Sequence, residues 1–146
     1  MQKPFAYRTR VRYAEVDRMG VAYHSRYIEW FEAARTELLR DLGLPYRELE
    51  DRGFLLPVVE VSCAYLAPAR YDECVEIQTV LEGLTRLKIE LSYEARNAES
   101  GAVLARGRTL HCFTNREGKP VRAEQGVIDI LKKRWEPHHV GVHSAE

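Results

Sequence analysis

A long helical pattern stands at residues 24–43, which read HSRYIEWFEAARTELLRDLG. Apolar side chains recur there every three or four residues, and the stripe that they form consists of Tyr27, Ile28, Phe31, Ala34, Leu38, Leu39 and Leu42. The wetter side carries Glu29, Glu32, Arg35 and Arg40. Ser25 is a candidate N-cap, and Gly43 followed by Pro45 is a stop signal. The pattern predicts an amphipathic helix of about 18 residues, roughly 27 Å long at the standard rise.

The residues on either side of this helix alternate between apolar and polar side chains, as half-buried strands do. One strand is predicted before the helix, at residues 5–13. Turn residues separate four further strands, which are predicted at residues 59–65, 75–81, 87–93 and 103–113. Short turns make these four strands antiparallel neighbours. Short helices are predicted at residues 45–51 and 124–133.

The order of strand, long helix and four strands predicts an α+β fold in two layers. One face of the sheet is apolar and must be buried. A curved antiparallel sheet of about five strands should therefore wrap around one long central helix. We expect a single domain over residues 1–136 and a frayed C-terminal tail at residues 137–146. The mixed outer face and the open edge of the sheet favour a second subunit, and we expect a dimer at least.

Composition excludes several classes of protein. Lys plus Arg number 22 and Asp plus Glu number 22, so the formal net charge is zero. A nucleic-acid partner is not expected, because binding phosphates requires a basic surplus. The apolar runs, such as residues 54–59, are too short for membrane insertion, and the first residues contain no apolar signal segment. The three cysteines lack the spacing of a zinc site or a disulfide framework, so we expect a cytoplasmic protein with no metal site.

The segment just before the long helix combines a carboxylate, a glycine loop and a helix start. Asp17 precedes Gly20, and the helical pattern begins near His24. The first N–H groups of a helix have no internal partners, and they can hold a carbonyl oxygen as it becomes an oxyanion. A nearby carboxylate can attack the carbonyl carbon or deprotonate a water that does so. This apparatus suits acyl transfer from a thioester, because a thiolate leaves easily.

The same residues also permit simpler interpretations. An Asp before a helix is often a cap or a surface charge, and His24 can be a structural or solvated histidine. Glu15 and Asp17 are two residues apart, so one of them can be a solvated strand-end charge. Alternatively, these two carboxylates can act as a general acid and base pair.

Residues 13–40 resemble a known family. The pattern is Tyr13-x-Glu15-x-Asp17-x-x-Gly20-Val21-x-Tyr23-His24-x-x-Tyr27, followed by Phe31-Glu32-x-Ala34-Arg35-x-Glu37-x-Leu39-Arg40. It is similar to the 4-hydroxybenzoyl-CoA thioesterase group of hotdog-fold proteins, above all to its YbgC-type acyl-CoA thioesterases. The resemblance continues through residues 56–59 and 65–72 and covers about residues 5–133. It implies an acyl-CoA substrate, no cofactor, and homodimers that share one continuous sheet and often pair into homotetramers.

The resemblance also implies roles for individual residues at a site on the subunit interface. Asp17 would be the catalytic nucleophile or general base, and a backbone N–H at His24 or its neighbour would polarise the carbonyl group. Gly20 and Val21 would shape the substrate pocket, and Tyr23 and His24 would contribute to substrate binding.

Coenzyme A carries phosphates, so cationic groups should line its route. Thr85, Arg86 and Lys88 match the positions where relatives place such residues, although a solvated strand end explains them equally well. Arg18 and Met19 stand where relatives often carry small residues, which leaves the acyl preference open.

Two other functions are compatible with the same fold. One is an acyl-CoA-binding or scaffold protein without significant turnover, since fold does not determine function. The other is a hydratase or dehydratase, which is disfavoured because the helix carries no histidine beyond His24.

Overall fold

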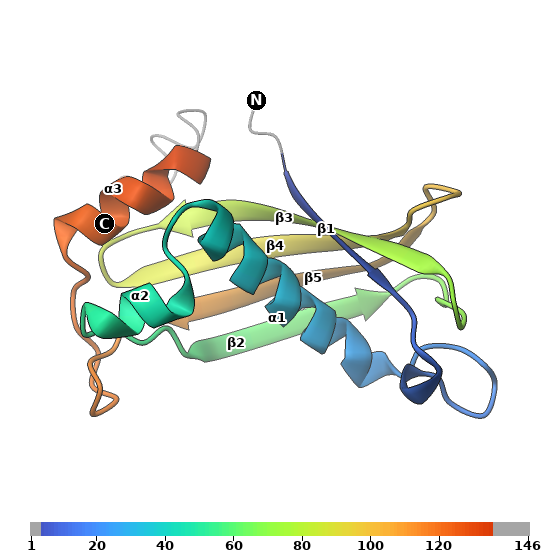
Figure 1. The fold of residues 1–146 in the computed structure, drawn as a ribbon. Coiled ribbons are helices and arrows are strands. Elements are labelled where there is room, and N and C mark those ends of the chain that lie inside the picture. The colour runs from blue at the N-terminus through green and yellow to red at the C-terminus, as the bar shows by residue number, and fades with distance from the viewer. Residues whose placement is uncertain (1–3, 136–146) are drawn as a thin grey trace.

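A computed structural model describes residues 4–135 and shows one long helix lying across one face of a curved sheet (Figure 1). Its strands are β1 (Phe5–Arg10), β2 (Val58–Tyr65), β3 (Cys74–Leu84), β4 (Lys88–Asn97) and β5 (Val103–Cys112). Its helices are α1 (His24–Asp41), α2 (Tyr46–Asp51) and α3 (Gln125–Leu131), with single 3-10 turns at Tyr13–Glu15 and Lys132–Arg134. The predicted order of elements is therefore confirmed. The first strand ends at Arg10 rather than at Tyr13, and a 3-10 turn over Tyr13–Glu15 follows it.

The sheet has five antiparallel strands in the order β1-β3-β4-β5-β2. The prediction that the last four strands are sequential neighbours is correct for β3, β4 and β5 and wrong for β2. β2 lies at the far edge and pairs with β5, from Val58 opposite His111 to Tyr65 opposite Ala105. Residues 66–73 do not close a hairpin. The N–H groups of Leu66 and Ala67 donate to the Leu104 carbonyl oxygen on β5, and Ala69, Asp72 and Glu73 bond to the chain between β1 and α1.

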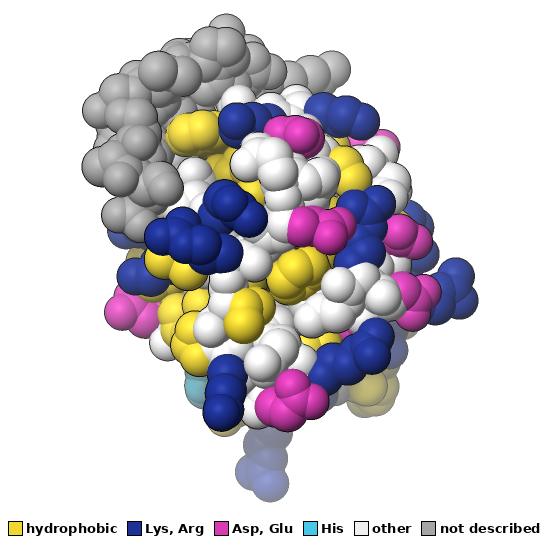
Figure 2. Space-filling model, turned by 90° about the vertical axis from the view of Figure 1, so that its left-hand side faces the viewer, with side chains coloured by type: hydrophobic (Ala, Val, Ile, Leu, Met, Phe, Trp, Pro, Cys, Tyr) yellow, Lys and Arg dark blue, Asp and Glu magenta, His cyan; other side chains and the backbone are white. Residues whose placement is uncertain are grey.

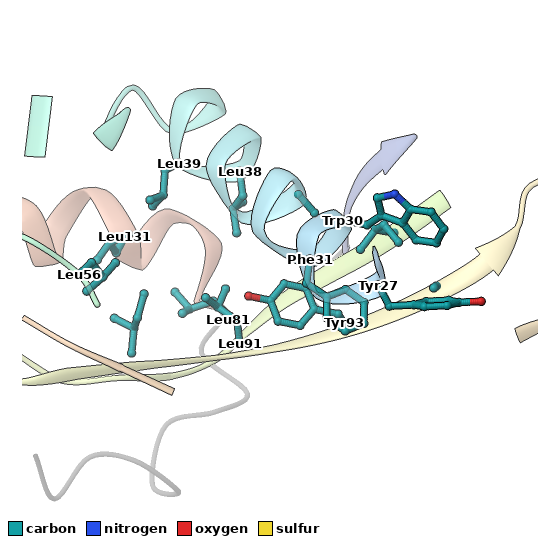
Figure 3. Packing of buried hydrophobic residues seen from close by; sticks show 14 of the residues in the cluster. Tyr27, Trp30, Phe31, Leu38, Leu39, Leu56, Leu81, Leu91, Tyr93 and Leu131 are labelled. Carbon is teal, nitrogen blue, oxygen red and sulfur yellow. The ribbon is translucent and has the colours of Figure 1, made fainter. Parts of the chain in front are cut away.

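The core lies between α1 and the sheet (Figure 3). The predicted stripe of α1 faces it, with Ile28 and Leu42 partly buried and the other members buried. Trp30, which the pattern omitted, is also buried. The ring of Phe31 stacks on that of Tyr93 with 4.6 Å between centroids. Gly107 on β5 leaves the space for this pair, since a Cβ atom there would lie 2.3 Å from the Phe31 ring.

Arg35 does not lie on the wetter side of α1, as the periodicity predicted, but is only 6% exposed. Its Nε donates to the Tyr46 hydroxyl at 2.9 Å and its Nη1 to the Tyr93 hydroxyl at 3.1 Å. The Tyr93 hydroxyl also bonds Thr109, which bonds the ring of buried His111. Neighbouring hydroxyls thus accept the hydrogen bonds of a buried guanidinium. The helical period of the sequence does not predict such partners, because they come from other elements.

The rest of the described chain carries few features that bear on function. No helix within residues 4–135 is long and apolar enough to cross a membrane. The three cysteines are unpaired, and in the same range no group of three or more His, Cys, Asp and Glu side chains is placed to hold a metal ion. The tail at residues 137–146 lies outside the described residues, and a domain boundary at residue 136 stays a prediction.

Candidate active site

The turn that carries Asp17 holds one of its carboxylate oxygens in place. Asp17 Oδ1 accepts hydrogen bonds from the backbone N–H groups of Met19 at 2.8 Å and Val21 at 3.4 Å. Gly20 closes the turn at a φ of 77°, a conformation that glycine adopts without strain. Asp17 Oδ2 has no hydrogen-bond partner in the described part of the chain. One oxygen is thus fixed by backbone amides and the other is free to meet a substrate.

The start of α1 follows directly and lacks a side-chain cap. Tyr23 is the N-cap residue, and its side chain makes no capping hydrogen bond. The prediction that Ser25 caps the helix is wrong, because the helix begins at His24 and Ser25 lies inside its first turn. The Arg26 N–H donates to the Tyr23 carbonyl oxygen at 2.9 Å. The N–H groups of His24 and Ser25 have no acceptor among residues 4–135, so they present two donors and the positive end of the helix dipole.

A cleft of about 430 Å³ opens beside these two features. It is lined by the carboxylate, the helix start and the end of β2 with the residues that follow, namely Asp17, Ala22, Tyr23, His24, Tyr27, Tyr65, Leu66, Ala67 and Pro68. The cleft therefore brings together three of the predicted site residues, Asp17, Tyr23 and His24. Gly20 and Val21 do not line it but form the turn that holds Asp17.

Aromatic rings make up much of the cleft wall. The rings of Tyr23 and His24 lie 4.3 Å apart, and those of Tyr27 and Tyr65 lie 5.2 Å apart and edge to face. Sequence reasoning assigned Tyr27 to the core and gave no role to Tyr65. Only the position of β2 in the folded sheet reveals that Tyr65, its last residue, meets the helix start. The resemblance did include residues 65–68, and that was the one signal in the sequence.

Glu15 is not a solvated strand-end charge, since only 3% of it is exposed. Its carboxylate accepts hydrogen bonds from the Arg12 N–H at 2.7 Å and the Trp30 Nε1–H at 3.1 Å. Burial acts to raise the pKa of Glu15, but the hydrogen bonds from Arg12 and Trp30 outweigh it and lower that pKa below its ordinary value. Glu15 does not line the cleft, so it does not form an acid and base pair with Asp17.

The predicted coenzyme A residues lie at the other end of the sheet. Asp17 is near the start of β3, whereas Thr85, Arg86 and Lys88 follow its end, and β3 spans 11 residues, or roughly 35 Å at the usual rise. Two of the three also have structural contacts. Thr85 Oγ1 accepts from the N–H groups of Leu87 and Lys88, and Arg86 Nε donates to the Ala123 carbonyl oxygen. Lys88 is exposed.

Figure 2 shows the end of the molecule that carries the turn between β3 and β4. Lys and Arg side chains are interspersed there with acidic ones around a few hydrophobic side chains. A single chain does not bring Thr85, Arg86 and Lys88 to the cleft that holds Asp17. Their role in binding therefore stays a prediction, and it depends on a second subunit.

Comparison with known proteins identifies the family. Residues 11–135 match the model of the thioesterase-like superfamily. The chain belongs to the thioesterase-like superfamily. Its relatives include the acyl-CoA thioester hydrolase YbgC of Escherichia coli, 33% identical over 129 residues that cover 88% of this chain and 96% of YbgC. They also include the putative acyl-CoA thioesterase YneP of Bacillus subtilis, 34% identical over 82% of this chain and 86% of YneP.

A solved structure shares the fold of this chain. The DHNA-CoA thioesterase from Staphylococcus aureus superposes with a TM-score of 0.82 at 32% identity, over 88% of each chain. The predicted hotdog fold and the predicted membership of the YbgC-type group are thereby confirmed, and the chain is a thioester hydrolase.

Proposed function

We propose that this thioesterase hydrolyses acyl-CoA to a free acid and the coenzyme A thiol, with Asp17 as its catalytic carboxylate and the start of α1 as its oxyanion hole. One observation carries the proposal: the free Oδ2 of Asp17 and the uncapped first turn of α1 adjoin one cleft. The printed names of YbgC and YneP support acyl-CoA as the substrate class.

The chemistry follows from this placement. The thioester carbonyl group lies in the cleft, and Asp17 either attacks its carbon directly or removes a proton from a water that attacks it. The negative charge that develops on the carbonyl oxygen is stabilised by the N–H groups of His24 and Ser25. The C–S bond then breaks, and the thiolate leaves and takes up a proton. If Asp17 is the nucleophile, water subsequently hydrolyses the mixed anhydride and regenerates the carboxylate.

The free edge of β2 supports a homodimer. Within residues 4–135 this strand pairs with β5 alone, and Val58, Val59 and Val61 are each 45–50% exposed along it. Such an apolar edge favours pairing with another strand. We therefore propose that two copies join along β2 into one continuous sheet, and that dimers pair further into homotetramers.

This dimer would also account for the distant cationic residues. A two-fold axis makes the β2 pair antiparallel, so the Tyr65 end of one strand lies beside the Val58 end of the other. Within one chain Val58 pairs with His111, and the adjacent Cys112 pairs with Lys88, so Val58 and Lys88 share one end of the sheet. Pairing thus brings Thr85, Arg86 and Lys88 of one subunit to the Asp17 end of the other, where we propose that they bind the coenzyme A phosphates.

The catalytic role of Asp17 is tested by release of free thiol from a panel of aliphatic and aromatic acyl-CoA thioesters. The Asp17→Asn variant keeps the size of the side chain but removes the carboxylate, which attacks the carbonyl carbon or accepts a proton from water. We expect its kcat/KM to fall about 100-fold or more. Asp72→Asn is the matched control, because Asp72 is exposed at the same end of the molecule and does not line the cleft. It should retain the wild-type rate.

Two outcomes would contradict the proposal. Equal rates for wild type and Asp17→Asn would exclude Asp17 as the catalytic residue. Tight binding of a coenzyme A ester with no thiol released by the wild type would instead indicate the binding or scaffold protein that the sequence left open. Parallel assays with acyl carrier protein thioesters determine whether coenzyme A or acyl carrier protein carries the acyl group of the substrate. A cytoplasmic location remains our expectation from the sequence.

A further inference from the structure

Tyr65 links the edge of the sheet to the start of α1. It is the last residue of β2, and its ring forms part of the cleft wall. Its hydroxyl donates a hydrogen bond to the His24 carbonyl oxygen at 2.8 Å. Its ring meets those of Tyr27 and His24 edge to face, with centroids 5.2 and 6.2 Å away. These contacts hold the phenol in one orientation against the first turn of the helix.

The acceptor of this hydrogen bond belongs to a peptide group that matters for the chemistry. The carbonyl group of His24 and the N–H group of Ser25 form one planar amide. A hydrogen bond to the oxygen of an amide polarises it and strengthens its N–H as a donor. The Ser25 N–H is one of the two donors at the helix start that lack an acceptor within residues 4–135.

We infer that Tyr65 is a positioning residue for catalysis, whose hydroxyl orients and polarises the His24–Ser25 peptide so that the Ser25 N–H stabilises the oxyanion. The inference rests on the proposed function and goes beyond it, because it names a side chain that tunes one donor of the oxyanion hole. Tyr65 itself need not touch the reacting atoms.

The chemistry of the phenol fits this role. Burial, together with the neighbouring Cys63 thiol, raises the pKa of Tyr65 to about 12, so the hydroxyl stays protonated at any pH where a thioester is a useful substrate. Tyr23 and Tyr27 also line the cleft, but among the described residues neither hydroxyl has a hydrogen bond to the helix start. Of these tyrosines, Tyr65 alone is placed to act on the His24 carbonyl group.

The first test compares Tyr65→Phe with Tyr71→Phe. The first variant keeps the ring contacts and removes the hydroxyl that donates to His24. Tyr71 is exposed at the same end, packs on Tyr13 and does not line the cleft, so its variant is a matched control. We expect Tyr65→Phe to lower kcat about tenfold with KM nearly unchanged, since the lost interaction acts on the transition state. We expect Tyr71→Phe to match the wild type.

A second measurement separates polarisation from a merely structural role. Tyr65 is replaced by fluorinated tyrosines of increasing acidity, assayed at a pH where each phenol is protonated. A more acidic phenol donates a stronger hydrogen bond, so kcat should rise steadily along the series. A flat series would overturn the inference, even if Tyr65→Phe proves unstable, because every member keeps both the ring and the hydroxyl.

The results also separate this inference from the proposed function. If Asp17→Asn is inactive while Tyr65→Phe matches the Tyr71→Phe control, only the role of Tyr65 is overturned. If Asp17→Asn keeps wild-type activity, the proposed function itself fails.

Discussion

At the scale of the residue, Glu15 and Asp17 show how burial separates two carboxylates that are two positions apart. Glu15 is turned into the protein, where Arg12 and Trp30 hydrogen-bond its oxygens, and its main-chain oxygen accepts from the Tyr23 N–H at 2.9 Å. It thereby joins the turn before Asp17 to the residue that precedes α1. Asp17 keeps one oxygen free beside the cleft. The first carboxylate serves structure and leaves the second available for chemistry.

This role of Glu15 predicts a pH-dependent contribution to stability. Its pKa is lowered in the folded protein, so the unfolded chain takes up the proton first as the pH falls. The stabilisation is therefore complete above the ordinary glutamate pKa of about 4.3 and is lost as the pH drops below it. We expect Glu15→Gln to lower the free energy of unfolding by about 2 kcal/mol at pH 7, with a smaller difference at pH 3.

Urea denaturation at both pH values measures this difference. Glu99→Gln is the control, because Glu99 is exposed in the turn between β4 and β5 and should show little effect at either pH. A deficit for Glu15→Gln that is the same at pH 3 and pH 7 would show that the charge of Glu15 does not contribute.

At the scale of the element, the contact between α1 and β5 depends on the absence of a side chain at Gly107. A Cβ atom there would lie 2.3 Å from a carbon of the Phe31 ring and 2.9 Å from the Ser62 carbonyl oxygen. The second neighbour is backbone and cannot turn away. Because Phe31 also stacks on Tyr93, a displaced ring would disturb the packing of α1 on β4 as well.

We therefore expect Gly107→Ala to destabilise the fold by about 1–3 kcal/mol through overpacking, as measured by thermal or urea denaturation. Gly126→Ala is the comparison, because a Cβ atom at Gly126 on α3 would meet its nearest neighbour at 3.6 Å, an ordinary contact. Alanine favours helix over glycine, so this variant should be neutral or more stable. Equal stability of the Gly107→Ala variant and the wild type would show that α1 can shift without cost.

At the scale of the whole molecule, the proposed dimer predicts that activity and assembly are lost together. Val61 is 48% exposed on β2, where we propose the two sheets to join. A lysine at the centre of such an edge opposes strand pairing. We expect Val61→Lys to shift the particle mass measured by light scattering toward the monomer and to lower kcat/KM for acyl-CoA at least tenfold, a loss comparable to that of a substrate-binding contact.

Glu99→Lys introduces the same residue in the exposed turn between β4 and β5, away from β2, and should leave the β2 pairing intact. A Val61→Lys variant that becomes monomeric and keeps full activity would show that the site is complete within one chain. That result would also remove Thr85, Arg86 and Lys88 from the coenzyme A site.

Local chemistry in the sequence was sufficient to predict much of this protein. The spacing of apolar residues located α1 and its buried stripe, and alternation located the strands, because these periods arise from backbone geometry within a few residues. The pattern from Tyr13 to Arg40 identified the family, and it predicts Asp17 as the catalytic residue. What that pattern left open was which neighbours each polar side chain would meet.

The tertiary structure alone decided features that depend on residues distant in the chain. It placed β2 beside β5, buried Arg35 among hydroxyls from α2 and β4, and directed Glu15 toward Trp30 rather than toward solvent. It also brought the Tyr65 hydroxyl to the His24 carbonyl group, across 41 positions of sequence. The physical reason is that a periodic pattern records only whether a side chain faces the core, whereas a hydrogen bond requires a partner that folding alone brings within reach.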